Sequence, residues 1–236
     1  MISYIFIGVV LIGLGFIFSR FRPTATKQIT DDLYALRCGF VNFYALRTND
    51  GVVLFDTGMN PSMAKRGLKK IGILLDSVTH IFLTHTDYDH AGGLAAFPNA
   101  VKYISTEEEQ MINGQTARRG IIRNRRIKSY KTMNNGETVV VGNTDIQAKI
   151  APGHTPGSVV YLIGNRYLAS GDLMRVSRKG AILPFLWLMN MNHGQNKEST
   201  KTINDLLNMA KYILTGHTGV HEIDFLRNTS FLKNDI

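Results

Sequence analysis

The sequence of 236 residues contains a single cysteine, Cys38. One cysteine excludes a fold held together by disulfides, and it also excludes a metal site built from several cysteines. Hydrophobic residues make up 44% of the chain and charged residues only 19%, which is not the composition of a disordered protein. After Pro23 there is no low-complexity stretch and no internal repeat. The composition indicates a globular protein in which histidine and carboxylate side chains would hold any metal.

Acidic residues are absent from residues 118–131, which we call the basic loop. The loop holds seven cations: Arg118, Arg119, Arg123, Arg125, Arg126, Lys128 and Lys131. They supply most of the formal net charge of +9, so the rest of the chain is close to neutral, unlike a uniformly basic nucleic-acid-binding protein. Three interpretations stay open: a solvated surface, attraction to anionic lipids, and recognition of an anionic substrate, nucleic acid included.

Charged side chains are also missing from residues 1–19, and residues 2–18 form an apolar run. As a helix this run would be roughly 25 Å long, at the short end of the range that spans a bilayer. A cleaved signal peptide and a buried core helix are the alternatives, but the run lacks a preceding positive charge and a following cleavage site. Arg20, Arg22 and Lys27 all follow the run, which places the C-terminal part in the cytoplasm by the positive-inside rule. We therefore predict a transmembrane anchor in residues 1–22, a single-pass membrane location and a cytoplasmic catalytic domain in residues 23–236.

The rest of the chain carries strand and helix signals. Apolar runs at residues 40–46 and 52–55 are joined by a segment that ends in Asp-Gly, which indicates a hairpin. Asn60 followed by Pro61 is a typical helix start. Further strands are expected at residues 78–84, 101–104, 139–141, 146–150, 159–163, 167–170 and 212–214, and helices at residues 91–97, from residue 106 and at residues 200–209. Strand runs separated by helices predict an α/β (α+β) fold in which helices cover sheets.

Four residues of metal-binding type occur within six positions after the strand expected at residues 78–84: His85, Asp87, Asp89 and His90. A loop at a strand end can direct its side chains towards different points, so it could serve two adjacent metals. A polar turn with an Asp or His helix cap is the alternative interpretation.

Three more residues of these types lie beside glycines next to other expected strands. They are His154 in Gly-His-Thr-Pro-Gly, Asp172 in Ser-Gly-Asp and His217 in Thr-Gly-His-Thr-Gly. Each is a weak signal alone, since His or Asp beside Gly is common in loops. Together with residues 85–90 they predict that one edge of a sheet gathers metal-binding side chains.

The order of these motifs resembles that of the metallo-β-lactamase-fold hydrolases. That family carries His-x-His-x-Asp-His, then a His in a Gly-His-Thr-Pro-Gly turn, an Asp and a last His. The resemblance covers roughly residues 33–217 and includes Asp-Thr-Gly at residues 56–58, similar to a family motif that supports the metal loop. It implies an αββα sandwich. It also implies two metal sites bridged by Asp172, with His85, Asp87 and His154 at one metal and Asp89, His90 and His217 at the other.

Asp87 departs from the family pattern, because it stands where the family has its second histidine. With three aspartates and a hydroxide against two divalent ions, the site would be neutral and would acidify water less than a site with histidine. A carboxylate also shifts metal preference towards iron or manganese. The family's flavodiiron branch has a carboxylate here, but this chain is too short for that branch's flavodoxin module. The resemblance thus implies two divalent ions, with zinc expected first and iron or manganese as alternatives.

These residues predict a membrane-anchored, metal-dependent hydrolase. A hydroxide that bridges the metals would attack a small ester, lactone or thioester, and Asp89 would orient it or carry a proton to the leaving group. A phosphodiesterase or nuclease that uses the basic loop is one alternative, and a non-catalytic metal-binding protein is another. We expect a small-molecule substrate and membrane contact through the N-terminal helix and the basic loop, and no nucleic-acid partner.

The remaining candidates are expected to be structural. Cys38 lies in or beside an early apolar strand and is interpreted as a core residue. His80, His193 and His221 lie near the candidate ligands in sequence, but none belongs to a motif. Residues 182–189 form an apolar run that is too short to span a bilayer, so it is interpreted as a core or lid segment, with a membrane-dipping patch or a substrate wall as alternatives.

Overall fold

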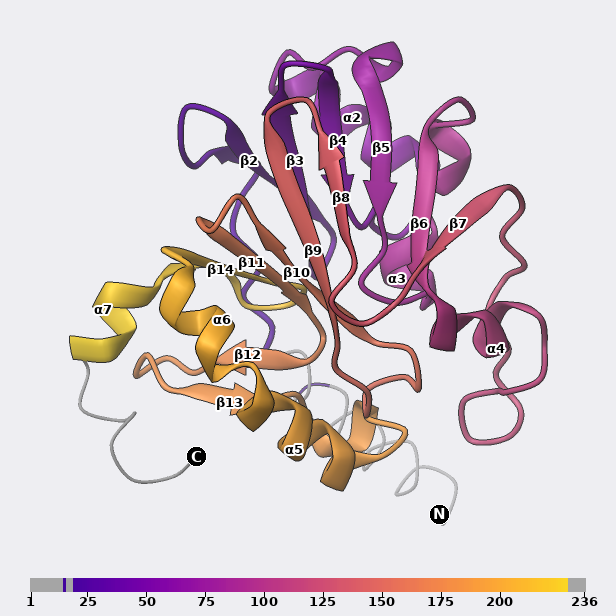
Figure 1. The fold of residues 1–236 in the computed structure, drawn as a ribbon, viewed down its shortest axis with the longest axis vertical. Helices are drawn as coiled ribbons and strands as arrows, with labels where there is room; N and C mark the ends of the chain where they lie inside the picture. The colour runs from indigo at the N-terminus through magenta and orange to yellow at the C-terminus, as the bar shows by residue number, and fades with distance from the viewer. Residues whose placement is uncertain (1–14, 16–18, 229–236) are drawn as a thin grey trace, which may run out of the picture.

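The structure, a computed structural model, describes residues 15 and 19–228. Two sheets pack face to face, and helices cover the outer face of each (Figure 1). The first sheet contains, in spatial order, β1 (Lys27–Gln28), β2 (Leu33–Cys38), β3 (Val41–Thr48), β4 (Gly51–Phe55), β5 (Val78–Phe82), β6 (Val101–Ser105) and β7 (Tyr130–Met133). The second contains β15 (Gly219–Glu222), β14 (Tyr212–Thr215), β11 (Tyr167–Gly171), β10 (Val159–Ile163), β9 (Thr144–Ile150) and β8 (Thr138–Val141). A separate ribbon pairs β12 (Met174–Val176) with β13 (Ile182–Pro184).

The helices are short, and in the sequence they connect strands, except for the last one, which follows β15. The α-helices are α2 (Pro61–Lys70), α3 (Tyr88–Ala91), α4 (Glu109–Ile112), α5 (His193–Thr202), α6 (Asn204–Met209) and α7 (Ile223–Asn228). Single turns of 3₁₀-helix are η1 (Leu75–Ser77), η2 (Leu94–Ala96), η3 (Thr106–Glu108) and η4 (Trp187–Met189). Figure 1 shows α2 against the first sheet and α5 and α6 on the far side of the second sheet.

Strands bury both of their faces, which explains the lack of polar alternation in the sequence. In β2, Leu33 and Ala35 belong to the cluster between the two sheets, while Leu36 and Cys38 belong to the cluster under α2. A third cluster packs the second sheet against α5, α6 and α7 and includes Ile203 and Leu207. Three buried clusters separate four layers, so the predicted αββα sandwich is confirmed.

Local signals in the sequence identify several elements correctly. The predicted hairpin forms between β3 and β4, with Thr48 opposite Gly51. Asn60 caps α2, because its side chain accepts a hydrogen bond of 2.9 Å from the Met63 N–H, and Pro61 opens the helix. Both elements depend on contacts within a few residues, which the sequence encodes directly.

Two predicted helices differ from the structure. No single helix covers residues 91–97: α3 already ends at Ala91, and the turn η2 (Leu94–Ala96) follows it. The chain turns at Gly92 and Gly93, where a Cβ would overlap the carbonyl oxygens of Met59 and Thr57. The helix expected at residues 200–209 breaks at Ile203, a fully buried residue between α5 and α6. Close packing with segments distant in the sequence sets the ends of α3 and α5, and the helix propensity of the local residues does not predict such packing.

The predicted membrane location is contradicted by the described part of the chain. Within residues 15 and 19–228, no helix has both the length and the apolar character needed to cross a bilayer. For the described residues, the prediction of a single-pass membrane protein with a cytoplasmic domain is therefore wrong. Residues 1–14 and 16–18, on which the predicted anchor falls, lie outside the described residues.

Candidate metal centre

Seven side chains converge at one end of the two sheets. They come from the loop after β5, from α3, from the loop between β9 and β10, and from the residues that follow β11 and β14. They are His85, Asp87, Asp89, His90, His154, Asp172 and His217, all of the metal-binding candidates in the sequence. Loops from both sheets contribute, so only the complete sandwich brings them together.

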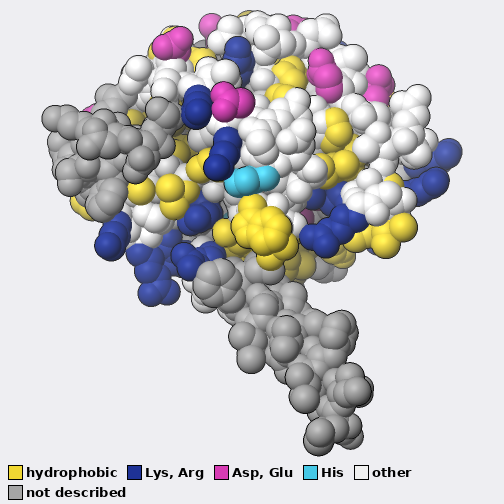
Figure 2. Space-filling view, turned by 90° about the horizontal axis from the view of Figure 1, so that it is seen from below, with side chains coloured by type: hydrophobic (Ala, Val, Ile, Leu, Met, Phe, Trp, Pro, Cys, Tyr) yellow, Lys and Arg dark blue, Asp and Glu magenta, His cyan; other side chains and the backbone are white. Residues whose placement is uncertain are grey.

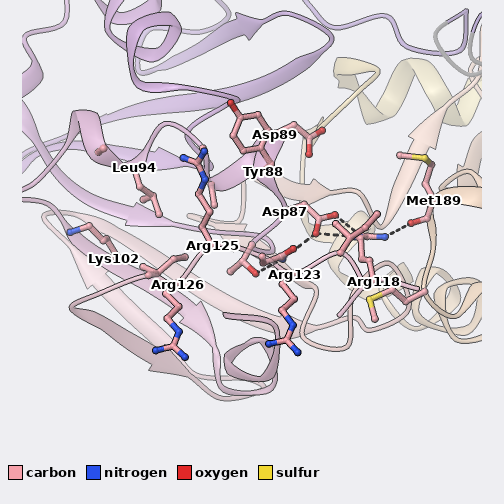
Figure 3. Close-up of a pocket in the computed structure, with 18 of the residues that line it drawn as sticks. Asp87, Tyr88, Asp89, Leu94, Lys102, Arg118, Arg123, Arg125, Arg126 and Met189 are labelled. Atoms are coloured by element: carbon pink, nitrogen blue, oxygen red, sulfur yellow. Dashed lines mark hydrogen bonds and ion pairs between the residues drawn. The ribbon is translucent and has the colours of Figure 1, made fainter. Parts of the chain in front are cut away.

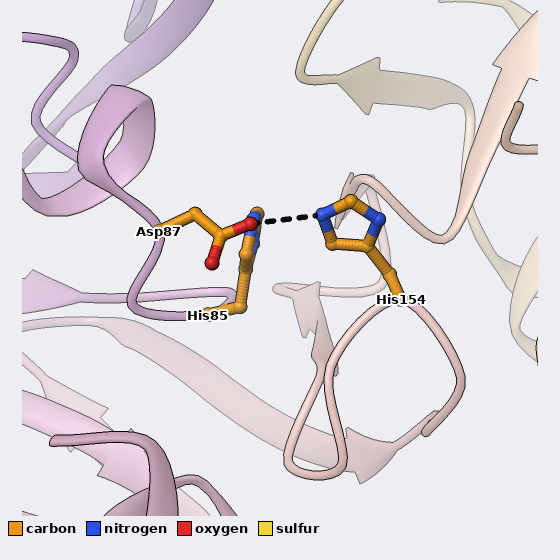
Figure 4. A group of neighbouring side chains, drawn as sticks. All are labelled: His85, Asp87 and His154. Atoms are coloured by element: carbon orange, nitrogen blue, oxygen red, sulfur yellow. Dashed lines mark hydrogen bonds and ion pairs between the residues drawn. The ribbon is translucent and has the colours of Figure 1, made fainter. Parts of the chain in front are cut away.

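Three overlapping sets of these side chains could each hold an ion. We call His85, Asp87 and His154 the first group and Asp89, His90 and His217 the second group; the third set, His85, His90 and Asp172, takes one histidine from each group together with the aspartate between them. In the first group, Oδ2 of Asp87 lies 3.6 Å from Nε2 of His85 and 3.3 Å from Nε2 of His154 (Figure 4). In the second, Oδ2 of Asp89 lies 3.8 Å from Nε2 of His90 and 3.3 Å from Nε2 of His217. Each group gathers one carboxylate oxygen and two imidazole nitrogens around one point.

Asp172 lies between the two groups. Its Oδ2 is 3.4 Å from Nε2 of His154 and 3.1 Å from Nε2 of His217, and its Oδ1 is 3.4 Å from Nε2 of His90. The carboxylate therefore faces imidazoles of both groups at once, as a bridging ligand must.

Three donor or acceptor atoms at the centre have no hydrogen-bond partner among the described residues. They are Nε2 of His85, Nε2 of His90 and Oδ1 of Asp172, and all three residues are buried. Leaving such atoms unpaired in the interior is costly, so a missing partner is the simplest physical reason for the arrangement. Imidazole nitrogens and carboxylate oxygens are the donors that zinc, iron and manganese accept. The residues present thus fit metal ions.

Hydrogen bonds at Nδ1 fix the orientation of three of the histidines. Nδ1 of His90 lies 2.7 Å from Oδ2 of Asp56, whose other oxygen accepts the Thr84 N–H at 2.8 Å. Nδ1 of His85 is 3.1 Å from the Thr84 hydroxyl, and Nδ1 of His217 is 3.0 Å from the Phe40 carbonyl oxygen. With Nδ1 engaged in this way, each ring presents Nε2 to the centre, which is the usual support for metal-binding histidines.

The Asp-Thr-Gly motif at residues 56–58 is hydrogen-bonded to His90 of α3. Thr57 donates both its N–H and its hydroxyl to the carbonyl oxygen of His90, at 2.7 and 2.9 Å. The backbone of Asp56 is left-handed, with φ of 61°, which Asp and Asn adopt more readily than most residues. This turn lets one short segment hold both the backbone and the ring of His90.

Charges in the cluster shift each other's protonation. Burial alone would lower the pKa of His217, but Asp172 and Asp89 raise it to about 9. Asp172, Asp56 and Asp89 likewise raise the pKa of the buried His90 well above its usual value. Burial would raise the pKa of Asp172, but the surrounding imidazoles of His217, His90 and His154 hold it well below its usual range. Without metal, these pKa shifts favour an ionised Asp172 beside protonated His90 and His217.

Glu108 joins two of the ligand-bearing loops, a role that its sequence context did not reveal. Its fully buried carboxylate accepts hydrogen bonds from the N–H and hydroxyl of Thr86, both at 2.8 Å, and from the Thr155 hydroxyl at 2.7 Å. Thr86 lies between His85 and Asp87, and Thr155 follows His154. Glu108 follows the expected helix start at residue 106, where an acidic residue is ordinary, so nothing in the sequence singles it out.

Arg118 is the second residue whose part in the centre the sequence did not reveal. Its guanidinium forms an ion pair with Asp87, and its Nη2 lies 2.8 Å from Nε2 of His154. Its Nη1 donates to the Met189 carbonyl oxygen at 2.6 Å, which holds the arginine in place. Asp87, the departure from the family motif, therefore has its own cationic partner from the basic loop.

The segment at residues 182–189 covers the centre from one side. Phe185 is buried, and its ring lies 5.2 Å from that of His154 and 5.3 Å from that of His217. Trp187 and Leu188 are exposed. The predicted core or lid segment thus packs directly on histidines of both groups.

The other histidines lie outside both groups. His80 stacks on Tyr103, His193 is within 2.9 Å of Asn190, and His221 is within 2.9 Å of the Thr218 carbonyl oxygen. Cys38 is buried and accepts the Met59 N–H at 3.1 Å. These contacts are those of structural residues.

Comparison with known proteins gives one family and several relatives. Residues 36–217 match the Metallo-beta-lactamase superfamily. The chain is 33% identical over 119 residues to a hydroxyacylglutathione hydrolase of Synechococcus sp., covering 49% of this chain and 40% of the relative. It is 29% identical over 140 residues to an N-acyl homoserine lactonase of Bacillus thuringiensis, covering 48% of this chain and 54% of the relative. The matched region thus spans about half or less of the length of these curated relatives.

Solved structures share the fold. A subclass B3 metallo-beta-lactamase of Bradyrhizobium japonicum superposes with a TM-score of 0.63 and 20% identity, covering 84% of this chain and 79% of that chain. A metallo-beta-lactamase family protein of Thermus thermophilus superposes with a TM-score of 0.65 and 21% identity, covering 86% and 78%. At such identities the likeness concerns the arrangement of sheets and helices.

Proposed function

This chain belongs to the Metallo-beta-lactamase superfamily, and we propose that it is a metal-dependent hydrolase whose catalytic centre is the cluster of seven histidine and aspartate side chains. The observation that carries the proposal is the set of buried, unpaired donor and acceptor atoms on His85, His90 and Asp172. The ligand atoms that these three residues offer lie within 4.8 Å of one another. A purely structural cluster would pair these atoms with each other or with the backbone.

Two divalent ions complete the proposed centre. The first group would hold one ion, the second group would hold the other, and Asp172 would reach both. Zinc is proposed first, because four imidazoles dominate the donor set, and iron or manganese are the alternatives that Asp87 favours. When bound, such ions lower the pKa of a water molecule and polarise the carbonyl oxygen of a substrate.

Asp89 is proposed as the residue that moves a proton. Its side chain is 22% exposed, more than that of Asp87 or Asp172, and it lines the cavity beside the centre. Burial would raise the pKa of Asp89, but the imidazoles of His90 and His217 lower it, so the carboxylate is ionised and can accept a hydrogen bond from a water molecule. From its position at the cavity wall it would orient the attacking water and pass a proton to the leaving group.

The proposed substrate is a small ester, lactone or thioester. The names of the two curated relatives point to a hydroxyacylglutathione and an N-acyl homoserine lactone. The cavity at the centre has a volume of about 970 Å³, which suits a small molecule. A phosphodiester is the second candidate, because arginines and lysines of the basic loop line the same cavity.

The test uses the full chain loaded with zinc, iron or manganese. Metal content is measured by elemental analysis, and turnover is measured on a hydroxyacylglutathione, an N-acyl homoserine lactone and bis(4-nitrophenyl) phosphate. Asp172→Asn is expected to lose metal and activity together, while Asp76→Asn, on the exposed turn η1, retains both. A protein that binds two ions and cleaves none of these bonds would contradict the hydrolase and support a non-catalytic metal-binding role.

A further inference from the structure

The cavity beside the candidate metal centre has walls of two kinds. Asp87 and Asp89 of the centre lie at one side, so a substrate in the cavity can place its scissile bond there (Figure 3). Apolar side chains such as Leu94, Ile122 and Ile127 form part of the wall. A cavity with an apolar wall and a few polar groups is the common form of a small-molecule site.

Cations dominate the rest of the cavity. Six positively charged residues line it in addition to Arg118: Lys102, Arg119, Arg123, Arg125, Arg126 and Lys128. Asp87 and Asp89 are the only acidic residues among the described residues that line it, and both are occupied by contacts within the centre. Among the described residues of the basic loop, Arg118 alone forms an ion pair. The cavity therefore carries a large uncompensated positive charge.

Two of these cations are held in place at the cavity. The guanidinium of Arg125 lies 5.2 Å from the centre of the Tyr88 ring, and Figure 3 shows it beside this ring. Nη2 of Arg119 donates to the Leu188 carbonyl oxygen at 2.9 Å. These contacts use a few of the five N–H donors of each guanidinium and leave the others for a ligand. A guanidinium with free donors binds carboxylate or phosphate oxygens in pairs.

Cations also gather on the outer surface of one face. Figure 2 shows Lys and Arg side chains on both sides of an apolar patch on one face, with the acidic side chains towards one edge. Clustered like charges repel one another and attract anions to the surface. A nucleic acid would also need aromatic rings for its bases, but Tyr88 is the only aromatic residue among those described at the cavity, and Arg125 covers it.

We propose that this cavity binds the anionic group of a small substrate, a carboxylate or a phosphate joined through an apolar segment to the ester or thioester bond at the metal centre. The inference rests on the proposed function, since it states which esters the hydrolase selects. Arg125 and Arg126 are the specificity residues of this proposal, because both line the cavity and Arg125 lies over the ring of Tyr88, the residue that precedes Asp89.

The test compares two esters that differ only in charge, 4-acetoxybenzoate and neutral 4-acetoxybenzamide. Zinc-loaded full chain is expected to show a higher kcat/KM for the anion. In the double variant Arg125→Gln/Arg126→Gln, the ratio of the two kcat/KM values is expected to fall about tenfold. The matched control is Lys65→Gln/Arg66→Gln, two exposed residues on α2 that remove the same charge from elsewhere, and it is expected to leave the ratio unchanged.

Binding without turnover separates this proposal from the proposed function. Benzoate, phenyl phosphate and benzamide are titrated calorimetrically into the protein and both double variants. Tighter binding of an anion than of benzamide, lost in Arg125→Gln/Arg126→Gln, supports the anion site even if neither ester is cleaved. The stronger of benzoate and phenyl phosphate identifies the anionic group. Equal ratios and affinities in the wild type and this variant would overturn the proposal, as would a single-stranded oligonucleotide that binds far more tightly than either small anion.

Discussion

Replacing Arg118 by Gln is expected to strengthen the binding of a metal ion to the first group. The guanidinium contacts the two atoms that an ion needs there, because it pairs with Asp87 and its Nη2 lies 2.8 Å from Nε2 of His154. An imidazole nitrogen has one lone pair, which either accepts a hydrogen bond or binds a metal. Binding of an ion to the first group must therefore displace Nη2 of Arg118.

The contacts of Arg118 set the size of the effect. Hydrogen bonds that involve a charged group contribute roughly 1.5–3 kcal/mol each. An ion at the first group would break two such bonds, from Nη2 of Arg118 to Asp87 and to His154. The Arg118 and Asp87 side chains are 16% and 14% exposed, so water compensates for part of the loss. We therefore expect a net gain of roughly 1.5–3 kcal/mol, which is about 10- to 100-fold in affinity.

The assay titrates zinc into metal-free full chain in competition with a chromophoric chelator. The wild type is expected to bind one ion tightly, at the second group, and another more weakly at the first. Arg118→Gln strengthens the second step alone, and Arg66→Gln, an exposed charge on α2, leaves both steps unchanged. Two equal steps in the wild type, or a weaker second step in Arg118→Gln, would show that the guanidinium supports metal binding and would refute this reasoning.

Three further results are expected. Asp56→Asn weakens metal binding about 10- to 100-fold by equilibrium titration, because one amide oxygen cannot accept from both Thr84 and His90; an affinity equal to that of Asp76→Asn would contradict this. Glu108→Gln lowers the free energy of unfolding by roughly 1–3 kcal/mol in urea, because the amide faces the buried donor N–H of Thr86 or of Gly157, whereas exposed Glu107→Gln has no effect. The pKa of His217 is raised to about 9, so its contribution to metal-free stability is complete below about pH 6.5 and is lost as the pH rises through 9. Thermal unfolding in chelator should show a lower Tm at pH 9 than at pH 6.5, and a Tm that rises over this interval would be the contrary result.

The fold could be predicted where one segment carries its own signal. The hairpin of β3 and β4 follows from Asp50-Gly51, and α2 follows from Asn60 and Pro61. The ends of α3 and α5 could not be predicted in the same way. They depend on a backbone approach at Gly92 and on the burial of Ile203, which involve segments far apart in the sequence.

The candidate site shows the same division. Every member of the two groups and Asp172 could be picked from the sequence, because four residues of metal-binding type crowd into one loop after a strand and three more stand beside glycines next to other strands. The residues that hold them in place could not all be picked. Asp56 belongs to a motif, but Glu108 follows an ordinary helix start and acts through Thr86 and Thr155 on two separate loops. A buried carboxylate of this kind becomes visible only when its hydrogen-bond partners are known.

The charge expected at the centre from the sequence differs from the charge that the structure shows, because the structure adds Arg118. Counted without its neighbours, Asp87 would make a centre with two divalent ions and a hydroxide neutral, and would weaken its power to acidify water. The structure sets the guanidinium of Arg118 against this carboxylate, and its Nε donates to Oδ1 of Asp87 at 3.0 Å. This contact leaves Oδ2 for an ion after Nη2 has moved away. Asp87 and Arg118 together then carry no net charge, like the neutral histidine of the family motif. The effect of an aspartate at position 87 on the charge of the centre therefore depends on Arg118, a cation that the fold places beside it from 31 residues further along the chain.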